Sequence, residues 1–544
     1  MGASSSIVQK GTSEQREVES LAASTGAMPM LQNSFSKLVN PQTNAIPLQS
    51  LQQVFCLNYK NPDCEASNIP DCFPGLLDHL GASIVDLFFI TGREGVSWIE
   101  FLRGYLKCCG RMPASMALNA LLRVFATTFT KAGLPLKLEF ESSDDDCKIS
   151  GSFLATDVLM LLWMCWTMLW DSSTSRCTKG KENLRLPDVN HLILSAVVSC
   201  TEVDSGFNLW DCGISALEVE LPVGKFLTWD LTTVPSLTDC FTHFVNVRLQ
   251  NSVSSEVKSE LSSSSLGKIP PREVCNIHLL THGRAWAISL SLKGTISAEI
   301  LKPHLPSDSD ETLENLLYRS SFHGRGLNRF WSNIEGYHGP LLFLVSAAAG
   351  DVHEDSALTQ QGFENRDVFC GSSGSLYAIG PIFHVFPPSD MCLRERERER
   401  DMVWKDKNFV YSHLHPTGRA YEPYPKPVGI AFGGTIGNER IYIHEDFARV
   451  TIRHHAVDKT YQPGSLFPSQ GFLAVEALIS EVEVWGLGGR TAKEVQASFK
   501  KREELFIEHR RKANLKTFAS WEDSPEKMMM DMMSDPNAVR REDR

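Results

Sequence analysis

The sequence has no excess of positive charge: its 53 Lys and Arg residues stand against 65 Asp and Glu residues, a formal net charge of −12. This balance excludes bulk electrostatic attraction to nucleic acid or anionic lipid as the basis of its function. The 14 cysteines include no CxxC pair, which argues against a zinc site and indicates reduced thiols. The most apolar run, residues 158–170, is shorter than the roughly 20 residues that cross a bilayer. These absences predict a soluble, intracellular protein.

The composition is that of an ordinary globular protein, with 42% apolar and 22% charged residues. At about 150 residues per domain, a chain of 544 residues is expected to form roughly three or four structural units. Each unit would be long enough to bury a core of its own.

The first six residues, MGASSS, fit the pattern for N-myristoylation, with Gly2 exposed after removal of Met1 and Ser6 at the favoured position. A single myristoyl chain gives only marginal membrane binding, so the attachment would be reversible and would need a partner. The alternative is a plain Gly/Ser-rich terminus. We predict a flexible, acylated N-terminus at residues 1–13.

Residues 14–110 have the apolar spacing of two helix–loop–helix units and resemble a pair of EF-hands. A calcium loop needs oxygen ligands at positions one, three and five and a bidentate glutamate at position twelve. Aligning the second loop on Val96 places Glu100 at position twelve. The other three ligand positions are occupied by Phe89, Thr91 and Arg93. We therefore predict a degenerate, structural EF-hand-like region without tight calcium binding.

A further helical region is expected at 111–250, and within it residues 158–170 are hydrophobic nearly all round, as in a buried core helix. An interfacial membrane helix is the alternative, although a basic polar face is missing. Eight serines then fall within residues 252–265. This composition predicts a Ser-rich linker at 251–274, the main domain boundary.

After the linker, short β-branched and aromatic runs bounded by Gly or Pro predict strands. These runs lie at 286–292, 340–345, 376–386, 428–432, 440–447, 450–457 and 481–487. One helix is expected over 311–320, preceded by a capping box from Ser307 to Asp310. After Gly489 the chain reads as a charged helix and tail, 491–544. Its apolar face is formed by Ala492, Val495, Phe499, Phe506 and His509. Together the patterns predict an α+β protein.

Three blocks occur in a fixed order: LLYRSSFHGRGLNRFW at 316–331, PVGIAFGGTIGNERIYI at 427–443 and EVEVWGLG at 481–488. They resemble a TLDc domain, which would cover residues 285–490. The full layout, with MGxxxS and an EF-hand-like region before this domain, is similar to the lysosomal, mTOR-associated TLDc proteins, and in particular to their plant branch.

The resemblance implies a β-sandwich of two antiparallel sheets flanked by helices, behind an all-α N-terminal region. It implies a non-enzymatic adaptor that binds the vacuolar-type proton pump or TOR-signalling proteins. No cofactor, metal, nucleic acid or small-molecule substrate is implied. The expected location is cytoplasmic, peripheral on lysosomal, vacuolar or other endomembranes.

The motif residues are expected to have structural or partner-binding roles rather than catalytic ones. They are His323, Gly324, Gly433, Gly434, Glu481, Glu483, Trp485 and Gly486. The glycines would supply positive φ or close backbone approach. The two glutamates alternate along a strand, so they would share a face that is either solvated or in contact with a partner. The alternative function is a redox-protective enzyme that uses Cys370 or this Glu481/Glu483 face.

Other histidines and two irregular segments complete the sequence-based expectations. A metal site at His413 and His415, or at His454 and His455, lacks a third ligand by spacing, so these are expected to be sheet-surface histidines. The strand after 340–345 is expected to be shortened by charges at 351–356. The Arg/Glu alternation at 390–407 predicts a solvated, low-complexity insert.

Overall fold

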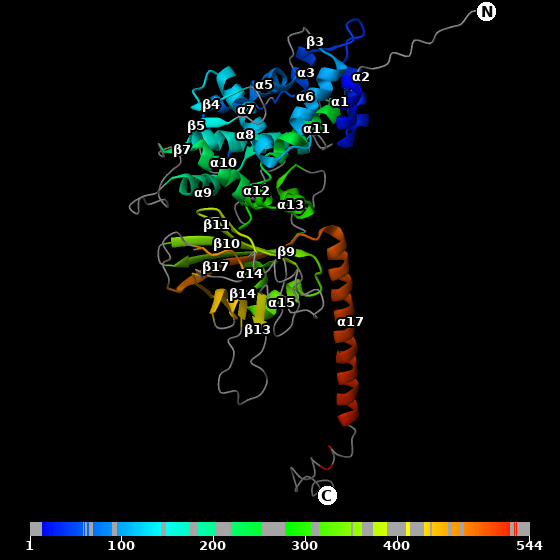
Figure 1. The fold of residues 1–544 in the computed structure, drawn as a ribbon. Helices are drawn as coiled ribbons and strands as arrows, with labels where there is room; N and C mark the ends of the chain where they lie inside the picture. Colours follow the sequence, from blue (N-terminus) through cyan, green and yellow to red (C-terminus); the bar gives the residue numbers. More distant parts are fainter. Residues whose placement is uncertain are drawn as a thin grey trace, which may run out of the picture.

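A helical half and a sheet half make up the chain, and a long C-terminal helix runs from the sheet half as a rod, as the computed structural model shows (Figure 1). The structure describes residues 13–522, and 527 and 529, apart from these gaps: 58, 60–62, 65–68, 90–94, 143–147, 175–182, 202–218, 253–277, 307–314, 350–351, 362–373, 389–409, 414–428, 436–437, 455–459, 465, 467–472 and 523–526. The predicted acylated terminus, most of the Ser-rich linker, Cys370, His415, His455 and the 390–407 insert lie outside these residues.

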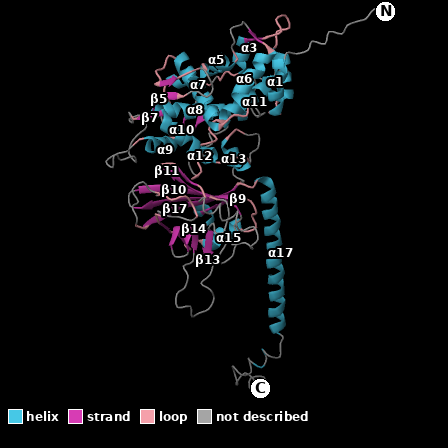
Figure 2. Ribbon diagram, viewed as in Figure 1, coloured by secondary structure: helices cyan, strands magenta, loops and turns pink. Residues whose placement is uncertain are grey.

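The first half is built from helices (Figure 2). They are α1 (Ser13–Ser24), α2 (Met28–Leu38), α3 (Leu48–Val54), α4 (Cys72–Asp78), α5 (Leu80–Phe88), α6 (Trp98–Cys109), α7 (Ala114–Lys131), α8 (Ala155–Thr174), α9 (Asn190–Cys200), α10 (Val223–Thr233) and α11 (Asp239–Ser252). The expectation of an all-α region was wrong in one respect, because short strands tie the loops together. These are β1 (Ile46–Pro47) with β3 (Gly95–Val96), β2 (Asp63–Cys64) with β6 (Arg185–Leu186), and β5 (Ile149–Leu154) between β4 (Leu138–Phe140) and β7 (Glu220–Pro222).

The EF-hand-like pairing is present: β1 and β3 join the two loops, with Ile46 opposite Val96. Phe89, at the first ligand position of the second loop, is 1% exposed and packs between the rings of Phe55 and Phe101. The Glu100 carboxylate caps α6, where it accepts a hydrogen bond from a main-chain N–H 2.8 Å away. Both positions therefore serve packing and capping, which is consistent with the predicted structural role.

The prediction of a buried core helix at 158–170 is confirmed by α8, where Trp163 and Trp166 are almost fully buried. The indole N–H of Trp163 donates to the main-chain oxygen of Pro187, so even its polar atom is paired inside the protein. Among the described helices, none is long and apolar enough to cross a membrane.

Asp230 of α10 gives the helical half a specific pH dependence. The residue is 1% exposed, its Oδ1 has no hydrogen-bond partner among the described residues, and burial raises its pKa well above the ordinary value. A raised pKa in the folded state means that stability is lost as pH rises through the acid range. Asp230→Asn should therefore be more stable than the unaltered chain at pH 7, by about 1–3 kcal/mol.

This advantage of Asp230→Asn should shrink as the pH falls toward about 3, because the carboxyl is then mostly protonated in the unfolded state as well as in the folded one. Urea denaturation across that pH range measures it. Asp78→Asn, at an exposed position, should leave the curve unchanged. If the difference in free energy of unfolding between the unaltered chain and Asp230→Asn did not change with pH, the raised pKa of Asp230 would be contradicted.

In the described part of the second half, ten strands form one hydrogen-bonded sheet of antiparallel pairs. They are β8 (Leu316–Arg319), β9 (Pro340–Ala349), β10 (Val352–Gln361), β11 (Ser375–Gly380), β12 (His384–Phe386), β13 (Val410–His413), β14 (Gly429–Thr435), β15 (Asn438–His444), β16 (Arg449–Ile452) and β17 (Val475–Gly486). The α+β prediction is confirmed. The helices of this half are α12 (His282–Ser291), α13 (Thr295–Leu301), the 3-10 turn η4 (Lys302–His304), α14 (Ser320–His323), α15 (Leu327–Ile334) and α17 (Gly489–Glu522).

The expected two separate sheets are instead one sheet that is continuous through β17. This strand pairs with β9 along its length, while β16 pairs with its beginning and β8 with its end. The two wings still pack face to face, with the rings of Phe343 and Phe432 5.3 Å apart. A single long strand can serve both wings because a register shift between Ile479 and Glu481 changes its course.

Two element predictions were wrong because short apolar runs do not distinguish a buried helix from a strand. Residues 286–292, predicted as a strand, lie mostly in α12, whose side chains are almost all buried. The helix expected over 311–320 is wrong where the structure describes it, since residues 316–319 form β8 and pair with β17.

The strand expected to be shortened near 351–356 is also present at full length. Strand β10 pairs with β9 from Val352 to Gln361 and with β11 on its other edge. Ladder hydrogen bonds join main-chain groups, so the charged sequence of this segment does not prevent the pairing.

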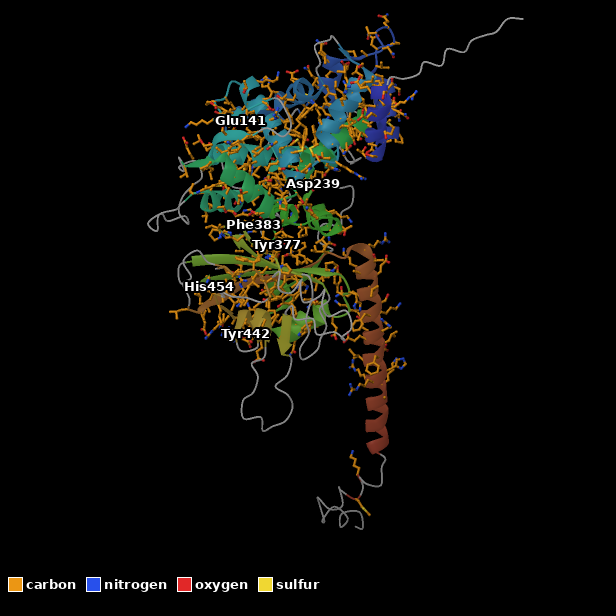
Figure 3. All side chains as sticks on the ribbon, viewed as in Figure 1. Glu141, Asp239, Tyr377, Phe383, Tyr442 and His454 are labelled. Carbon is orange, nitrogen blue, oxygen red and sulfur yellow. The ribbon has the colours of Figure 1, made fainter. Side chains whose placement is uncertain are left out.

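Both faces of the central strands are covered. On β9, Leu341 and Phe343 face the core between the wings, while Leu342 and Leu344 face the helical half. Tyr377 and Phe383 lie where the two halves meet (Figure 3). Helices α12 and α13 lie between the sheet and the rest of the helical half (Figure 1). One face of the sheet is therefore an interface within the chain.

Candidate functional site

The candidate site begins with the tight turn that follows β8. Its hinge is Gly324, whose φ of 88° favours glycine. The Tyr318 hydroxyl donates to the main-chain oxygen of Gly324 at 2.8 Å, and the Nδ1 atom of His323 accepts from the main-chain N–H of Arg319 at 2.9 Å. Burial lowers the pKa of His323. The small-residue-His-Gly motif therefore closes the turn on itself, and His323 acts as a structural acceptor.

Glu481 of β17 is held by the residues of this turn. Its carboxylate accepts from the main-chain N–H of Ser321 at 2.9 Å, from the Ser320 hydroxyl, and from the Arg319 Nε at 3.2 Å. Burial by itself would raise the pKa of Glu481, but these hydrogen bonds keep it below the ordinary value. The carboxylate is thus ionised and fully occupied by donors.

Glu483 lies two residues further on, with a side chain that is 0% exposed. It accepts from the Trp485 indole N–H at 3.0 Å and from the main-chain N–H of Leu280 at 3.4 Å. His278 Nδ1 lies 3.3 Å away and Arg319 Nε 3.6 Å away. The carboxylate joins the last strand of the sheet to the segment that enters α12.

These contacts correct the expectation of a solvated or partner-facing pair. Glu481 and Glu483 do share a face, but residues 278–280 and the β8 turn cover it. The sequence analysis missed Arg319, Ser320 and His278. The position of Arg319 and Ser320 within the recognised 316–331 block was the only feature of the sequence that could have indicated them. No feature of the sequence indicated His278, because it is 205 residues from Glu483 in the chain.

The motif glycines occupy the positions expected of them. Gly433 and Gly434 have φ values of 70° and 76° in the turn of the β14–β15 hairpin, and the N–H of Gly434 donates to the Thr460 hydroxyl. At Gly486 a Cβ would lie 2.7 Å from the Tyr337 ring. The prediction of positive φ or close approach is confirmed at all three positions.

The Glu481 and Glu483 carboxylates both accept hydrogen bonds from residues of the fold itself. A general base needs an accessible proton acceptor, whereas Glu481 and Glu483 are bonded within the fold. Among the described residues, no group of three His, Cys, Asp or Glu side chains is placed to hold a metal ion. Cys370 lies outside the described residues, as do His415 and His455.

The three sequence blocks thus form one structural unit: the β8 turn, the glycine hairpin and the end of β17. Residues 294–488 match the family model described as the TLDc domain. The chain contains a TLDc domain. No curated protein matches the chain as a whole.

The TLDc domain begins at α13, so α12 and His278 precede the matched residues. A TLDc domain indicates a regulatory or oxidation-resistance type of role, and proteins that carry it are generally non-enzymatic. In this chain the Glu483 carboxylate of the domain's last strand contacts His278 and Leu280, which lie outside the domain. The site is therefore best described as the junction between the TLDc domain and the helical half.

Proposed function

We propose that the protein is a non-enzymatic adaptor that binds protein partners through its TLDc domain and the helix that follows it. The observation that carries this proposal is α17, a 34-residue helix that projects beyond the sheet (Figure 1). Helices without tertiary contacts are marginal in water, so an exposed helix of this length favours a binding element.

Only the first turns of α17 pack against the TLDc domain. The Gln496 side chain donates to the main-chain oxygen of Asn333 at 2.8 Å, and the Phe499 ring lies against Gly336. Residues 501–513 are exposed on every side. Among the described side chains of the helix, the large apolar ones that are exposed are Val495, Leu505, Phe506 and Ile507. The first turns of the expected apolar face therefore pack on the TLDc domain. Its later residues, within 501–513, are exposed and could contact a partner.

The proposed partners are the vacuolar-type proton pump or TOR-signalling proteins, and the proposed location is the cytoplasmic surface of lysosomal, vacuolar or other endomembranes. The resemblance stated above supports both. An acyl group on Gly2 would supply weak membrane attachment. A second contact through α17 would then make the attachment specific.

Binding of the purified chain to purified vacuolar-type proton pump tests the proposal. Phe506→Asp should weaken binding at least about tenfold, because an apolar side chain that is 67% exposed in the free protein would be buried by the partner. Since most of the ring is exposed, the melting temperature should not change.

The matched control is Ala497→Asp, which places the same charge at an exposed position on the opposite side of the helix. It should bind as the unaltered chain does. Equal loss of binding in both variants, or no binding by the unaltered chain, would contradict the proposed adaptor function.

A further inference from the structure

Four histidines lie in or beside the first turn of α12. We call them the histidine cluster: His191 of α9, His278, His282 and His304 of η4. Thr281 caps the helix by accepting from the main-chain N–H of Arg284. A helix N-terminus carries partial positive charge, so protonated histidine is disfavoured beside it. The cluster lies where the helical half meets the TLDc domain.

His191 connects α9 with both α12 and the sheet. Its main-chain oxygen accepts from the N–H of Phe383, in the loop between β11 and β12, and its ring lies 6.1 Å from the Phe383 ring. The Nε2 atom is buried and has no partner in the described part of the chain. Burial, and then the charge of Arg284, lower the pKa of His191 to about 3. The imidazole is therefore neutral in the closed junction.

His304 of η4 also lies beside the first turn of α12. Its ring lies 5.1 Å from that of His282, and its buried Nε2 has no hydrogen-bond partner within the described ranges. Burial, with the neighbouring His282 and His278, lowers the pKa of His304 well below its ordinary value. A proton on this Nε2 atom would therefore have no hydrogen-bond acceptor among the described residues.

The remaining charges around the cluster favour neutral imidazoles at His191 and His304. Arg284, in the first turn of α12, adds a positive charge. On the sheet side, Glu483 lies beside His278 and is already paired with Arg319. From α13, the Glu299 carboxylate lies toward Gly489, at the start of α17.

Two further groups complete the surroundings. Before α9, the Asp188 carboxylate accepts from the main-chain N–H of Asn190. His278 Nδ1 lies 3.3 Å from the Glu483 carboxylate. Burial disfavours a proton at His191 and at His304, because the pKa of each imidazole is lowered there.

We propose that the histidine cluster is an acid-sensitive latch between the helical half and the TLDc domain, closed at neutral pH and opened as the pH falls toward 5. Opening means that the first turn of α12 separates from α9, η4 and β17. Water then reaches the two unpartnered Nε2 atoms, and the Glu483 and Trp485 face of β17 becomes accessible.

The size of the effect follows from linkage. A histidine that is neutral when buried and has an ordinary pKa near 6.5 when exposed shifts the opening equilibrium by about 30-fold at pH 5. His191 and His304 each contribute such a factor. The proposed latch goes beyond the proposed partner binding by α17, and the two proposals do not depend on each other.

Amide hydrogen exchange of the full chain at pH 7.5 and pH 5, corrected for the intrinsic exchange rates, tests the latch. In the unaltered chain, exchange in residues 282–291 should accelerate at least about tenfold at pH 5. In the double variant His191→Gln with His304→Gln, which cannot be protonated at these positions, this acceleration should be lost. His338→Gln, at an exposed position of the same domain, should accelerate as the unaltered chain does.

No acceleration in the unaltered chain, or the same acceleration in the double variant, would overturn the proposal. If the double variant does not fold, His304→Gln alone should show a clearly smaller acceleration than the unaltered chain, and an equal one would overturn the proposal. Exchange in α6, which packs on α1, α2, α5, α7 and α11, should stay constant and separates opening of the latch from global unfolding.

Discussion

Replacing Glu483 with alanine is expected to lower the free energy of unfolding by about 3–5 kcal/mol, the usual cost of removing one partner from a buried ion pair. The carboxylate is fully buried, accepts from the Trp485 indole and lies 3.6 Å from the Arg319 guanidinium. Alanine removes the acceptor for the Leu280 main-chain N–H as well. Urea denaturation followed by circular dichroism measures the change.

Glu476→Ala is the matched control, because Glu476 lies on the same strand and is exposed. It should change the free energy of unfolding by no more than about 0.5 kcal/mol. Glu483→Gln keeps an acceptor for the indole but loses the charge, so its loss should fall between those of the two alanine variants. Similar losses at positions 476 and 483 would contradict the junction described here.

Gly283→Ala is expected to destabilise the chain by about 3 kcal/mol, at the upper end of the range for overpacking. A Cβ at this position would lie 1.7 Å from the main-chain oxygen of Asp188 and 2.8 Å from its carbonyl carbon. Main-chain atoms cannot rotate away as a side chain can, so α12 would have to move off the segment before α9. Thermal unfolding measures the loss.

Gly224→Ala makes the same change at the second residue of another helix, α10, where no atom lies within 4 Å of the added Cβ. Alanine has the higher helix propensity, so this variant should be unchanged or up to about 1 kcal/mol more stable. If Gly283→Ala were equally well tolerated, the close packing of α12 on the helical half would be wrong.

Local features of the chain could be predicted because they depend on neighbouring residues. The run at 158–170, which is hydrophobic nearly all round, predicted the buried helix α8, and the charged segment after Gly489 predicted α17. The glycines at 324, 433 and 434 were expected at positive φ, since turn geometry is a property of a few consecutive residues. The three ordered blocks, including 316–331, predicted the TLDc domain itself.

The helix α12 and the strands β8 and β10 were not predictable in this way. A run that is buried on all sides has no polar face to reveal its period, which is why 286–292 read as a strand. The charges at 351–356 suggested an interrupted strand, but main-chain pairing with β9 and β11 forms it. Whether such a segment forms a helix or a strand therefore depends on the elements that pack against it and pair with it.

The sequence by itself determined the α+β class, the EF-hand-like pair, the TLDc motifs and the glycines that close their turns. Only the tertiary structure decided that Glu483 is buried, that Glu481 is held by the β8 turn, and that one sheet supplies both wings. The physical reason is distance along the chain. The donors to Glu483 come from residue 278 and from residue 319, so no local pattern around 481–488 could reveal whether the carboxylate faces water, a partner or the protein's own helical half.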